Sequence, residues 1–193
     1  MVAYKKNPAD LTDEKLVEKI TKNDQELYIH IVERYQGPLI RYVRTIVYEH
    51  EAAEDVVQNT FIKAYQNLRS FKLDKKFSSW IYRIAHNEGI NYIKKHKREV
   101  RPDDETWFDS VPDERLTAED EVDLKILKSA TGSAIAKLEE KYREPLTLFY
   151  LEAKSYQEIG EILRIPTATV GTRINRAKKQ LKDLIKEKGV ENE

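Results

Sequence analysis

The sequence predicts an all-α protein made of two small helical domains joined by an acidic, flexible linker. Its 193 residues include only 6 Gly, 6 Pro and no Cys, which favours helices and excludes a disulfide framework or a cysteine metal site. Apolar residues recur at helical spacing towards both ends of the chain, whereas residues 99–121 combine two prolines with an acidic excess and no helical period. We therefore expect one domain over residues 1–98 and another over residues 122–193.

The formal net charge of zero results from an uneven distribution of charge along the chain. Residues 1–98 carry 18 Lys and Arg against 13 Asp and Glu, residues 99–123 carry 2 against 11, and residues 124–193 carry 14 against 10. Two mildly basic ends suit nucleic acid, which would repel the acidic middle. No uncharged run approaches the ~20 residues that a membrane helix needs, so we expect a cytoplasmic protein without membrane insertion.

The first domain opens with two helical patterns. Thr12 precedes two acidic residues and an apolar stripe, which predicts a capped helix start. A longer helix is expected from about Asp24, with a kink or a short turn at Gly37 and Pro38 before the pattern resumes.

A third helix is expected over residues 51–68, with an apolar inner side that ends in Tyr65 and Leu68. Its outer side presents polar and charged residues that can face solvent or a partner protein. These are Glu54, Asp55, Gln58, Asn59 and Lys63.

A basic loop over residues 70–76 offers Phe71 as an exposed aromatic candidate. The helix that follows has Trp80 among its core residues and a polar face made of Ser79, Arg83, His86, Asn87 and Lys94. Aromatic and cationic side chains beside a polar helix are the composition of a single-strand nucleic-acid site, in which bases stack and phosphates are neutralised. Taken alone, this signal is weak.

Beyond the linker, helices are expected from about residue 122. The linker contains two aromatic residues, Trp107 and Phe108, which could dock on a partner or contact a neighbouring helix. Gly132 weakens the first of the later helices, and Pro145 is expected in the first turn of the next, where its missing N–H does little harm.

Residues 155–185, SYQEIGEILRIPTATVGTRINRAKKQLKDLI, predict a helix-turn-helix. Ser155 and Glu158 form a capping box, Gly160 allows a second helix to cross closely, Pro166 ends the first helix and Thr167 can cap the second. The apolar positions of the second helix, at steps of four, three, four and three, are Val170, Ile174, Ala177, Leu181 and Leu184. The opposite face carries donors for base edges and phosphates, although a solvated basic face is the simpler alternative.

Three stretches resemble the extracytoplasmic-function (ECF) sigma factors of bacteria, which belong to the sigma-70 family. They are EDVVQNTFIKAYQNLRSF at residues 54–71, FSSWIYRIAHNEGINYIKKHKR at residues 77–98 and YREPLTLFYLEAKSYQEIGEILRIPTATVGTRINRAKKQL at residues 142–181. The resemblance covers nearly the whole chain outside the tails and the linker. It implies a sigma-2-like bundle over residues 1–98 and a sigma-4-like helix-turn-helix domain over residues 122–193.

The resemblance also implies a function, that of a promoter-specificity subunit of the stress- or envelope-response type. Asp55, Gln58 and Asn59 would dock on the clamp helices of the large polymerase subunit. The residues implied for opening the minus-ten element and holding a flipped base are Phe71, Lys72, Lys75, Lys76, Ser79, Arg83, Asn87 and Lys94. Those implied for reading the minus-thirty-five element in the major groove are Thr167, Thr169, Thr172, Arg173, Asn175, Arg176 and Lys179.

The implied partners are bacterial RNA polymerase core, promoter DNA and an anti-sigma factor. No cofactor is implied, and the acidic linker would pass through the RNA exit channel.

The sequence departs from the family pattern at three places. Gly171 stands at the first outward position of the second helix, so that one DNA contact would be missing and the helix start would be looser. Arg164 stands where the turn commonly has Gly, which would strain a residue at positive φ. Glu88 and Gly89 place a carboxylate near the core side of the minus-ten helix.

Two other classes of protein compete with this interpretation. An enzyme lacks support, since the sequence has no HExxH motif, no Gly-rich phosphate loop and no Cys nucleophile. The acidic cluster at residues 103–105 lies in a Pro-bearing segment and is a poor metal site. An ordinary regulator would bind duplex DNA as a symmetric dimer, and a protein-interaction scaffold would bind neither DNA nor polymerase.

Overall fold

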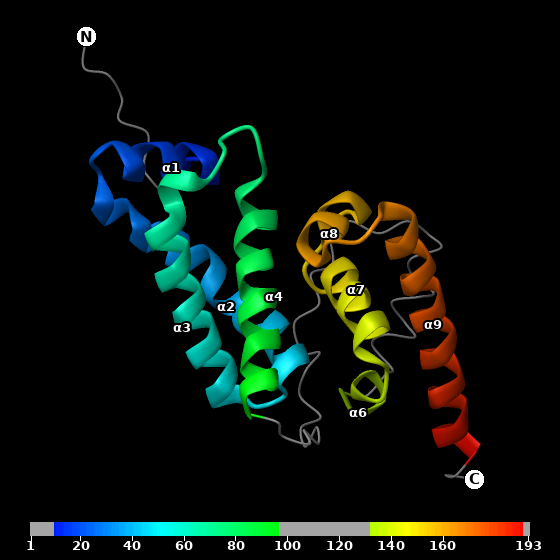
Figure 1. The fold of residues 1–193 in the computed structure, drawn as a ribbon. Coiled ribbons are helices and arrows are strands. Elements are labelled where there is room, and N and C mark those ends of the chain that lie inside the picture. Colours follow the sequence, from blue (N-terminus) through cyan, green and yellow to red (C-terminus); the bar gives the residue numbers. More distant parts are fainter. Residues whose placement is uncertain (1–9, 97–131, 191–193) are drawn as a thin grey trace.

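The computed structural model describes residues 10–96 and 132–190, and within these ranges every regular element is a helix (Figure 1). The expected all-α fold is confirmed. The N-terminal half, residues 10–96, contains α1 (Asp13–Lys22), η2 (Gln25–Leu27), α2 (Tyr28–Val47), α3 (His50–Asn67), η3 (Leu68–Ser70) and α4 (Phe77–His96). The C-terminal half, residues 132–190, contains α6 (Gly132–Ala136), α7 (Glu140–Tyr150), α8 (Tyr156–Leu163) and α9 (Thr167–Val190). The linker, its Trp107 and Phe108, and the helix expected from residue 122 lie outside the described residues.

Helix α1 begins as the sequence predicts. The Thr12 hydroxyl accepts a hydrogen bond from the backbone N–H of Lys15 at 3.4 Å, and two acidic residues occupy the first turn. Leu16, Val17 and Ile20 are buried, so the amphipathic stripe attaches this short helix to α2 and α4.

Helix α2 runs without interruption through Gly37 and Pro38, so the short turn expected there does not form. Pro38 removes only one amide donor from the helix. The residues around it, Tyr35, Leu39 and Tyr42, are at most 8% exposed. Packing of this buried face therefore keeps the helix continuous across the proline.

Helix α7 likewise contains a proline, Pro145, in its interior rather than in its first turn, contrary to expectation. The missing N–H leaves the carbonyl of Lys141 without its helical donor. Leu146 and Leu148 on the same helix are at most 1% exposed. Burial of the helix against α9 and α2 offsets the lost hydrogen bond.

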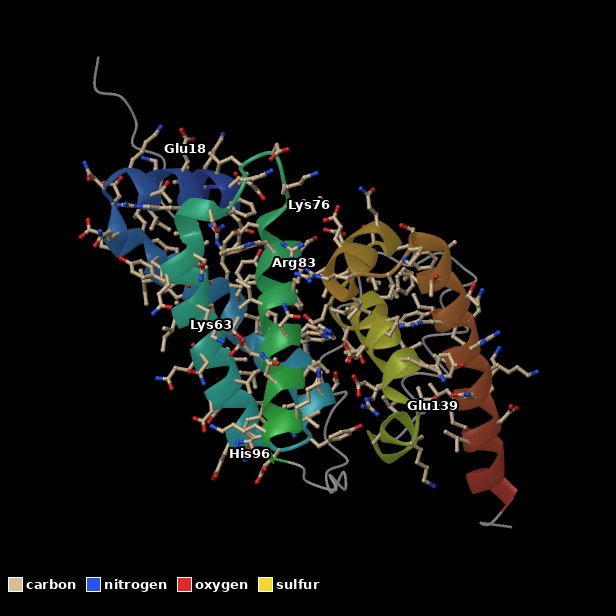
Figure 2. All side chains as sticks on the ribbon, in the orientation of Figure 1. Glu18, Lys63, Lys76, Arg83, His96 and Glu139 are labelled. Carbon is tan, nitrogen blue, oxygen red and sulfur yellow. The ribbon has the colours of Figure 1, made fainter. Side chains whose placement is uncertain are left out.

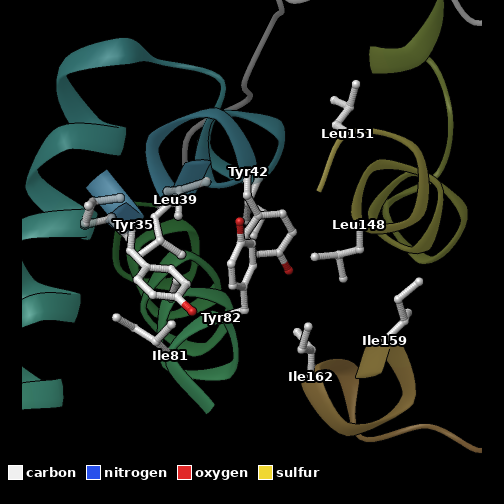
Figure 3. Packing of buried hydrophobic residues seen from close by; sticks show 14 of the residues in the cluster. Tyr35, Leu39, Tyr42, Ile81, Tyr82, Leu148, Leu151, Ile159 and Ile162 are labelled. Carbon is white, nitrogen blue, oxygen red and sulfur yellow. The ribbon is translucent and has the colours of Figure 1, made fainter. Parts of the chain in front are cut away.

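One continuous apolar core connects the two halves. Helices α2, α3 and α4 pack on one another, α7 and α8 pack on α9, and the two groups meet where α8 lies on α4 and α7 lies on α2. Figure 3 shows Tyr42 and Tyr82 of the N-terminal half opposite Leu148 and Ile162 of the C-terminal half. The DNA-binding elements predicted from the sequence are therefore held in a defined relation to one another.

Candidate nucleic-acid interface

The basic loop between η3 and α4 forms a cavity of about 400 Å³ at the N-terminal end of α4. Figure 2 shows Lys76 at that end of the helix and Arg83 further along it. The lining residues are Ser70, Phe71, Lys72, Lys75, Lys76, Ser79, Trp80 and Arg83, together with Glu161 of α8. Six of the eight residues implied for the minus-ten element are thus brought together.

The aromatic part of this cavity differs from the expectation. Phe71 is only 8% exposed, so its assignment as an exposed aromatic is wrong. Its backbone N–H bonds to the carbonyl of Leu68, and its ring lies 5.5 Å from that of Phe77 and 5.4 Å from that of Trp80. Trp80, assigned to the core from sequence, is half-buried and lines the cavity, which makes it the more accessible stacking surface.

Ser79 adds a polar group to the cavity wall. The residue is 4% exposed, and its Oγ has no hydrogen-bond partner among the described residues. A buried hydroxyl without a partner is costly. It would gain a partner if a polar group entered the cavity.

Two of the residues implied for the minus-ten element lie elsewhere. Asn87 and Lys94 are exposed further along α4 and do not line the cavity. On the same helix, Glu88 accepts a hydrogen bond from Lys63 of α3 at 2.7 Å. Gly89 is buried, and a Cβ atom there would lie 3.1 Å from Cγ2 of Ile46. The Glu88 carboxylate therefore bonds to α3 instead of entering the core.

The helix-turn-helix forms as the sequence predicts. The Ser155 hydroxyl accepts the N–H of Glu158, and the Glu158 carboxylate accepts the N–H of Ser155 at 2.9 Å. At Gly160 a Cβ atom would lie 2.9 Å from the carbonyl oxygen of Ile165, so only glycine permits this crossing. Arg164 adopts the left-handed conformation at φ 55° and ψ 46°, which strains a non-glycine residue as expected.

The capping box also controls the ionisation of Glu158. Partial burial acts to raise its pKa, but the net effect is a lowered pKa. The carboxylate is stabilised by the hydroxyl and N–H of Ser155 and by the ammonium of Lys76. Lys76 belongs to the basic loop and lies 3.1 Å from Glu158.

The exposed side of α9 agrees with its sequence pattern. Val170, Ile174, Ala177 and Leu181 are at most 1% exposed. Of the residues implied for the minus-thirty-five element, those fully on the surface are Thr167, Thr172, Asn175, Arg176 and Lys179, whereas Thr169 and Arg173 are half-buried. Thr167 is already the first residue of the helix instead of its cap.

Gly171 is half-buried, so it is not a fully outward position. A Cβ atom there would lie 3.3 Å from Cε2 of Tyr156, so the lack of a side chain allows a close approach of α8. That one DNA contact is missing at this position stays a prediction. Periodicity could not show the close approach, because it places a residue on a helix face without showing what covers that face.

The residues implied for polymerase docking lie together on α3. Asp55, Gln58 and Asn59 are all exposed, and Ile62, 48% exposed, continues the same stripe one turn further on. Tyr65 was expected on the inner side, but it is 41% exposed, and its ring packs against Tyr28 at 4.9 Å. The face is therefore more apolar than its polar residues suggested.

Other kinds of site find no support in the described ranges. Among residues 10–96 and 132–190, no group of three His, Cys, Asp or Glu side chains could hold a metal ion. In the same ranges, none of the helices has the length and apolarity needed to cross a membrane. The acidic cluster at residues 103–105 lies outside the described part of the chain.

Comparison with protein families gives one match in each half. Residues 31–99 match Sigma-70 region 2, and residues 129–181 match Sigma-70 region 4. Both basic elements described above fall within these two matches.

Individual relatives extend over most of the chain. The sequence is 36% identical over 181 residues to the ECF RNA polymerase sigma factor SigW of Bacillus subtilis (strain 168), covering 88% of this chain and 97% of that protein. It is 34% identical over 186 residues to the ECF RNA polymerase sigma-E factor of Haemophilus influenzae, covering 91% and 96%.

Among solved structures, the fold is similar to CnrH in complex with the cytosolic domain of CnrY. That similarity has a TM-score of 0.67 at 23% identity and covers 91% of this chain and 97% of CnrH. The sigma factor RpoE in complex with the anti-sigma factor NepR from Bartonella quintana gives 0.60 at 25% identity, covering 82% and 96%. The matches to both regions and the identity of 34–36% to the two ECF sigma factors over most of the chain show that it belongs to the ECF sigma factors of the sigma-70 family.

Proposed function

We propose that this ECF sigma factor directs RNA polymerase core to promoters, opens the minus-ten element and thereby starts transcription in a stress or envelope response. The observation that carries the proposal is the cavity at the start of α4, which combines lysine ammonium groups, an aromatic ring and an unpaired buried hydroxyl. Strand opening requires capture of unpaired bases, and stacking contributes ~1–3 kcal/mol per base. A flipped base can stack on Trp80 while the phosphates of its strand bind Lys72, Lys75 and Lys76.

The second proposed contact is with duplex DNA at the minus-thirty-five element. Helix α9 presents Asn175, Arg176 and Lys179 on its exposed side, and such side chains bond base edges and phosphates in the major groove. The domain boundaries that accompany this proposal are residues 1–98 and 122–193, with residues 99–121 as the linker.

The third proposed contact is with polymerase core, through the exposed face of α3 made by Asp55, Gln58 and Asn59. The protein would act without catalysis of its own, in the cytoplasm where promoter DNA is found. An anti-sigma factor is the proposed negative regulator, by analogy with RpoE, whose solved complex contains one.

Run-off transcription with purified core over a genomic promoter library tests the proposal. We expect transcripts from discrete start sites only when the chain is present. The variant Asp55→Arg should reduce core binding and transcription while the helical circular-dichroism signal stays unchanged. Failure of the wild-type chain to bind core in a pull-down, together with dimeric binding to duplex DNA, would instead support an ordinary regulator.

A further inference from the structure

The cavity at the N-terminal end of α4 contains positive charge that the fold does not neutralise. Its cationic lining residues are Lys72, Lys75, Lys76 and Arg83. Among the residues that the structure describes, Lys76 forms an ion pair with Glu158 at 3.1 Å, whereas the other three cations form none. The described lining contains one carboxylate, that of Glu161. A recess with such an excess of positive charge attracts a ligand that carries several negative charges.

Two polar groups of α4 lack a partner and lie where one ligand can reach both. Arg83 is half-buried, and within residues 10–96 and 132–190 its guanidinium forms no hydrogen bond or ion pair. The hydroxyl of Ser79, a residue only 4% exposed, is likewise unpaired in these ranges. The two residues are four positions apart on one face of the helix, and both line the cavity. Such groups are costly without partners, and a guanidinium binds phosphate through two parallel N–H groups.

Trp80 supplies the aromatic side of the cavity, and two neighbouring rings fix its position. The centroid of the half-buried indole lies 5.4 Å from that of Phe71 and 5.5 Å from that of Phe77. Both phenylalanines are at most 8% exposed. A ring that is fixed before the ligand arrives loses little freedom on binding. An aromatic surface beside phosphate-binding cations fits a nucleotide.

The size of the cavity favours one nucleotide over a length of strand. Its volume of about 400 Å³ is within the range of ~300–1,000 Å³ that is typical of small-ligand pockets. Asn87 and Lys94, further along α4, do not line it. At the helix end, the N–H of Phe77 already donates to the carboxylate of Glu14 at 3.1 Å. Phosphates would therefore bind the loop lysines and Arg83 instead of this amide.

We propose that this cavity binds a free nucleoside triphosphate, a small molecule that competes with promoter DNA. The base stacks on Trp80, and the hydroxyl of Ser79 forms a hydrogen bond with the ligand. The phosphates bind the cations that have no ion pair, which are Lys72, Lys75 and Arg83. The inference rests on the proposed function in one respect, since the nucleotide occupies the place proposed for the flipped minus-ten base.

Titration calorimetry of the full chain with ATP, adenosine and inorganic pyrophosphate tests the chemistry of the site. We expect ATP to bind at least about tenfold more tightly than pyrophosphate, because only ATP gains a stacked base. Adenosine should also bind more weakly than ATP, because it lacks the phosphates. Equal affinities for ATP and pyrophosphate would reduce the cavity to a general anion site and overturn the proposal.

The fluorescence of Trp80 tests where the base binds. The chain has two tryptophans, Trp80 and Trp107, so Trp107→Phe leaves Trp80 as the reporter. ATP should quench its emission and pyrophosphate should not, because only ATP brings a base onto the ring. Binding of ATP without quenching would place the nucleotide elsewhere and contradict the proposal.

Ser79→Ala, compared with Ser78→Ala, tests the unpaired hydroxyl. Ser78 is half-buried on the same turn but does not line the cavity. We expect Ser79→Ala to weaken ATP binding roughly fivefold, the effect of one hydrogen bond. Its urea midpoint should stay unchanged or rise, because a methyl group replaces a buried hydroxyl that has no partner. Ser78→Ala should leave ATP binding unchanged. Equal ATP affinities of the wild type and Ser79→Ala would remove this residue from the site and overturn its part in the proposal.

Competition with a fluorescein-labelled single-stranded oligonucleotide separates this proposal from the proposed function. ATP should displace the oligonucleotide, whereas pyrophosphate at the same concentration should displace much less. Oligonucleotide binding without ATP binding would overturn the nucleotide site and leave the minus-ten site standing. ATP binding that quenches Trp80, without oligonucleotide binding, would support the nucleotide site and count against the minus-ten site. Binding of both ligands without displacement would overturn the shared site.

Discussion

The proposed single-strand cavity and the proposed recognition helix, α9, are built in opposite ways. The cavity is recessed, and the ring of Phe71 in its wall is only 8% exposed. Behind the wall, the fully buried ring of Phe77 packs against Phe71 and Trp80. The polar side of α9 is convex and exposed, and it lies opposite the buried stripe that anchors the helix. A flipped base needs a pocket, whereas a major groove accepts a protruding helix. In the first region binding and stability are therefore coupled, and in the second they are separable.

The largest effect is expected from Phe77→Ala. The ring is fully buried and contacts Tyr35, Phe71 and Trp80, so its removal should cost about 3–5 kcal/mol of unfolding free energy. Urea denaturation followed by circular dichroism measures this loss. The control Lys76→Ala, at an exposed side chain of the same site, should weaken oligonucleotide binding at nearly constant stability. Similar stability losses in both variants would contradict the coupling.

Arg176→Ala should show that DNA binding by α9 can be weakened without a loss of stability. If Arg176 contacts a base in two places, the variant loses about 1–3 kcal/mol of duplex binding. Its unfolding free energy should change little, since the hydrogen bond from Arg176 to the Tyr142 hydroxyl is long, at 3.5 Å. Fluorescence anisotropy with a minus-thirty-five duplex and polymerase holoenzyme measures the effect. Unchanged binding by both Arg176→Ala and Arg173→Ala would remove these residues from the recognition surface.

Gly160→Ala tests the crossing that presents α9. The added methyl group would lie 2.9 Å from the carbonyl oxygen of Ile165, in the turn between α8 and α9, so this turn must shift, at a cost of about 1–3 kcal/mol. Thermal unfolding should show the loss. Gly37→Ala is the comparison, because a Cβ atom there meets nothing within 4 Å apart from its chain neighbours. The ring of Pro38 disfavours a helical residue with a Cβ atom before it and offsets the usual gain from alanine, so the loss of stability should be smaller than in Gly160→Ala.

The smallest effect is expected from Ser155→Ala, which removes the helix cap at a cost of ~1 kcal/mol at neutral pH. The pKa of Glu158 is lowered in the folded protein from its ordinary value of 4.5, so its carboxylate stabilises the fold above that pH. This contribution is lost as the pH falls through the lowered value. The difference between wild type and variant should therefore shrink in acid, as followed by urea denaturation across pH. A difference independent of pH would show that Glu158 takes no part.

Local sequence signals predicted much of the fold because their physical causes are local. The capping box at Ser155, the buried period of α9 and the glycine at position 160 all depend on neighbours within a few residues. The exposed triad on α3 also followed from helical spacing alone.

Errors arose where distant packing decides the outcome. Phe71 is buried because its ring packs against those of Phe77 and Trp80. Helix α2 stays continuous at Pro38 because the residues that flank the proline are buried in the core. The buried Glu144 and Glu152 look like surface residues in the sequence, since nothing nearby identifies the donors that come from α2 and α4. Contacts between halves have no periodic signature.

The exposed stripe on α3 has a consequence for the order of assembly. Asp55, Gln58 and Ile62 remain accessible while α7 and α8 rest on α2 and α4. The docking that we propose on α3 therefore needs no change in the packing of α7 and α8. Polymerase can bind the chain as it is folded here, before either of the proposed DNA contacts forms.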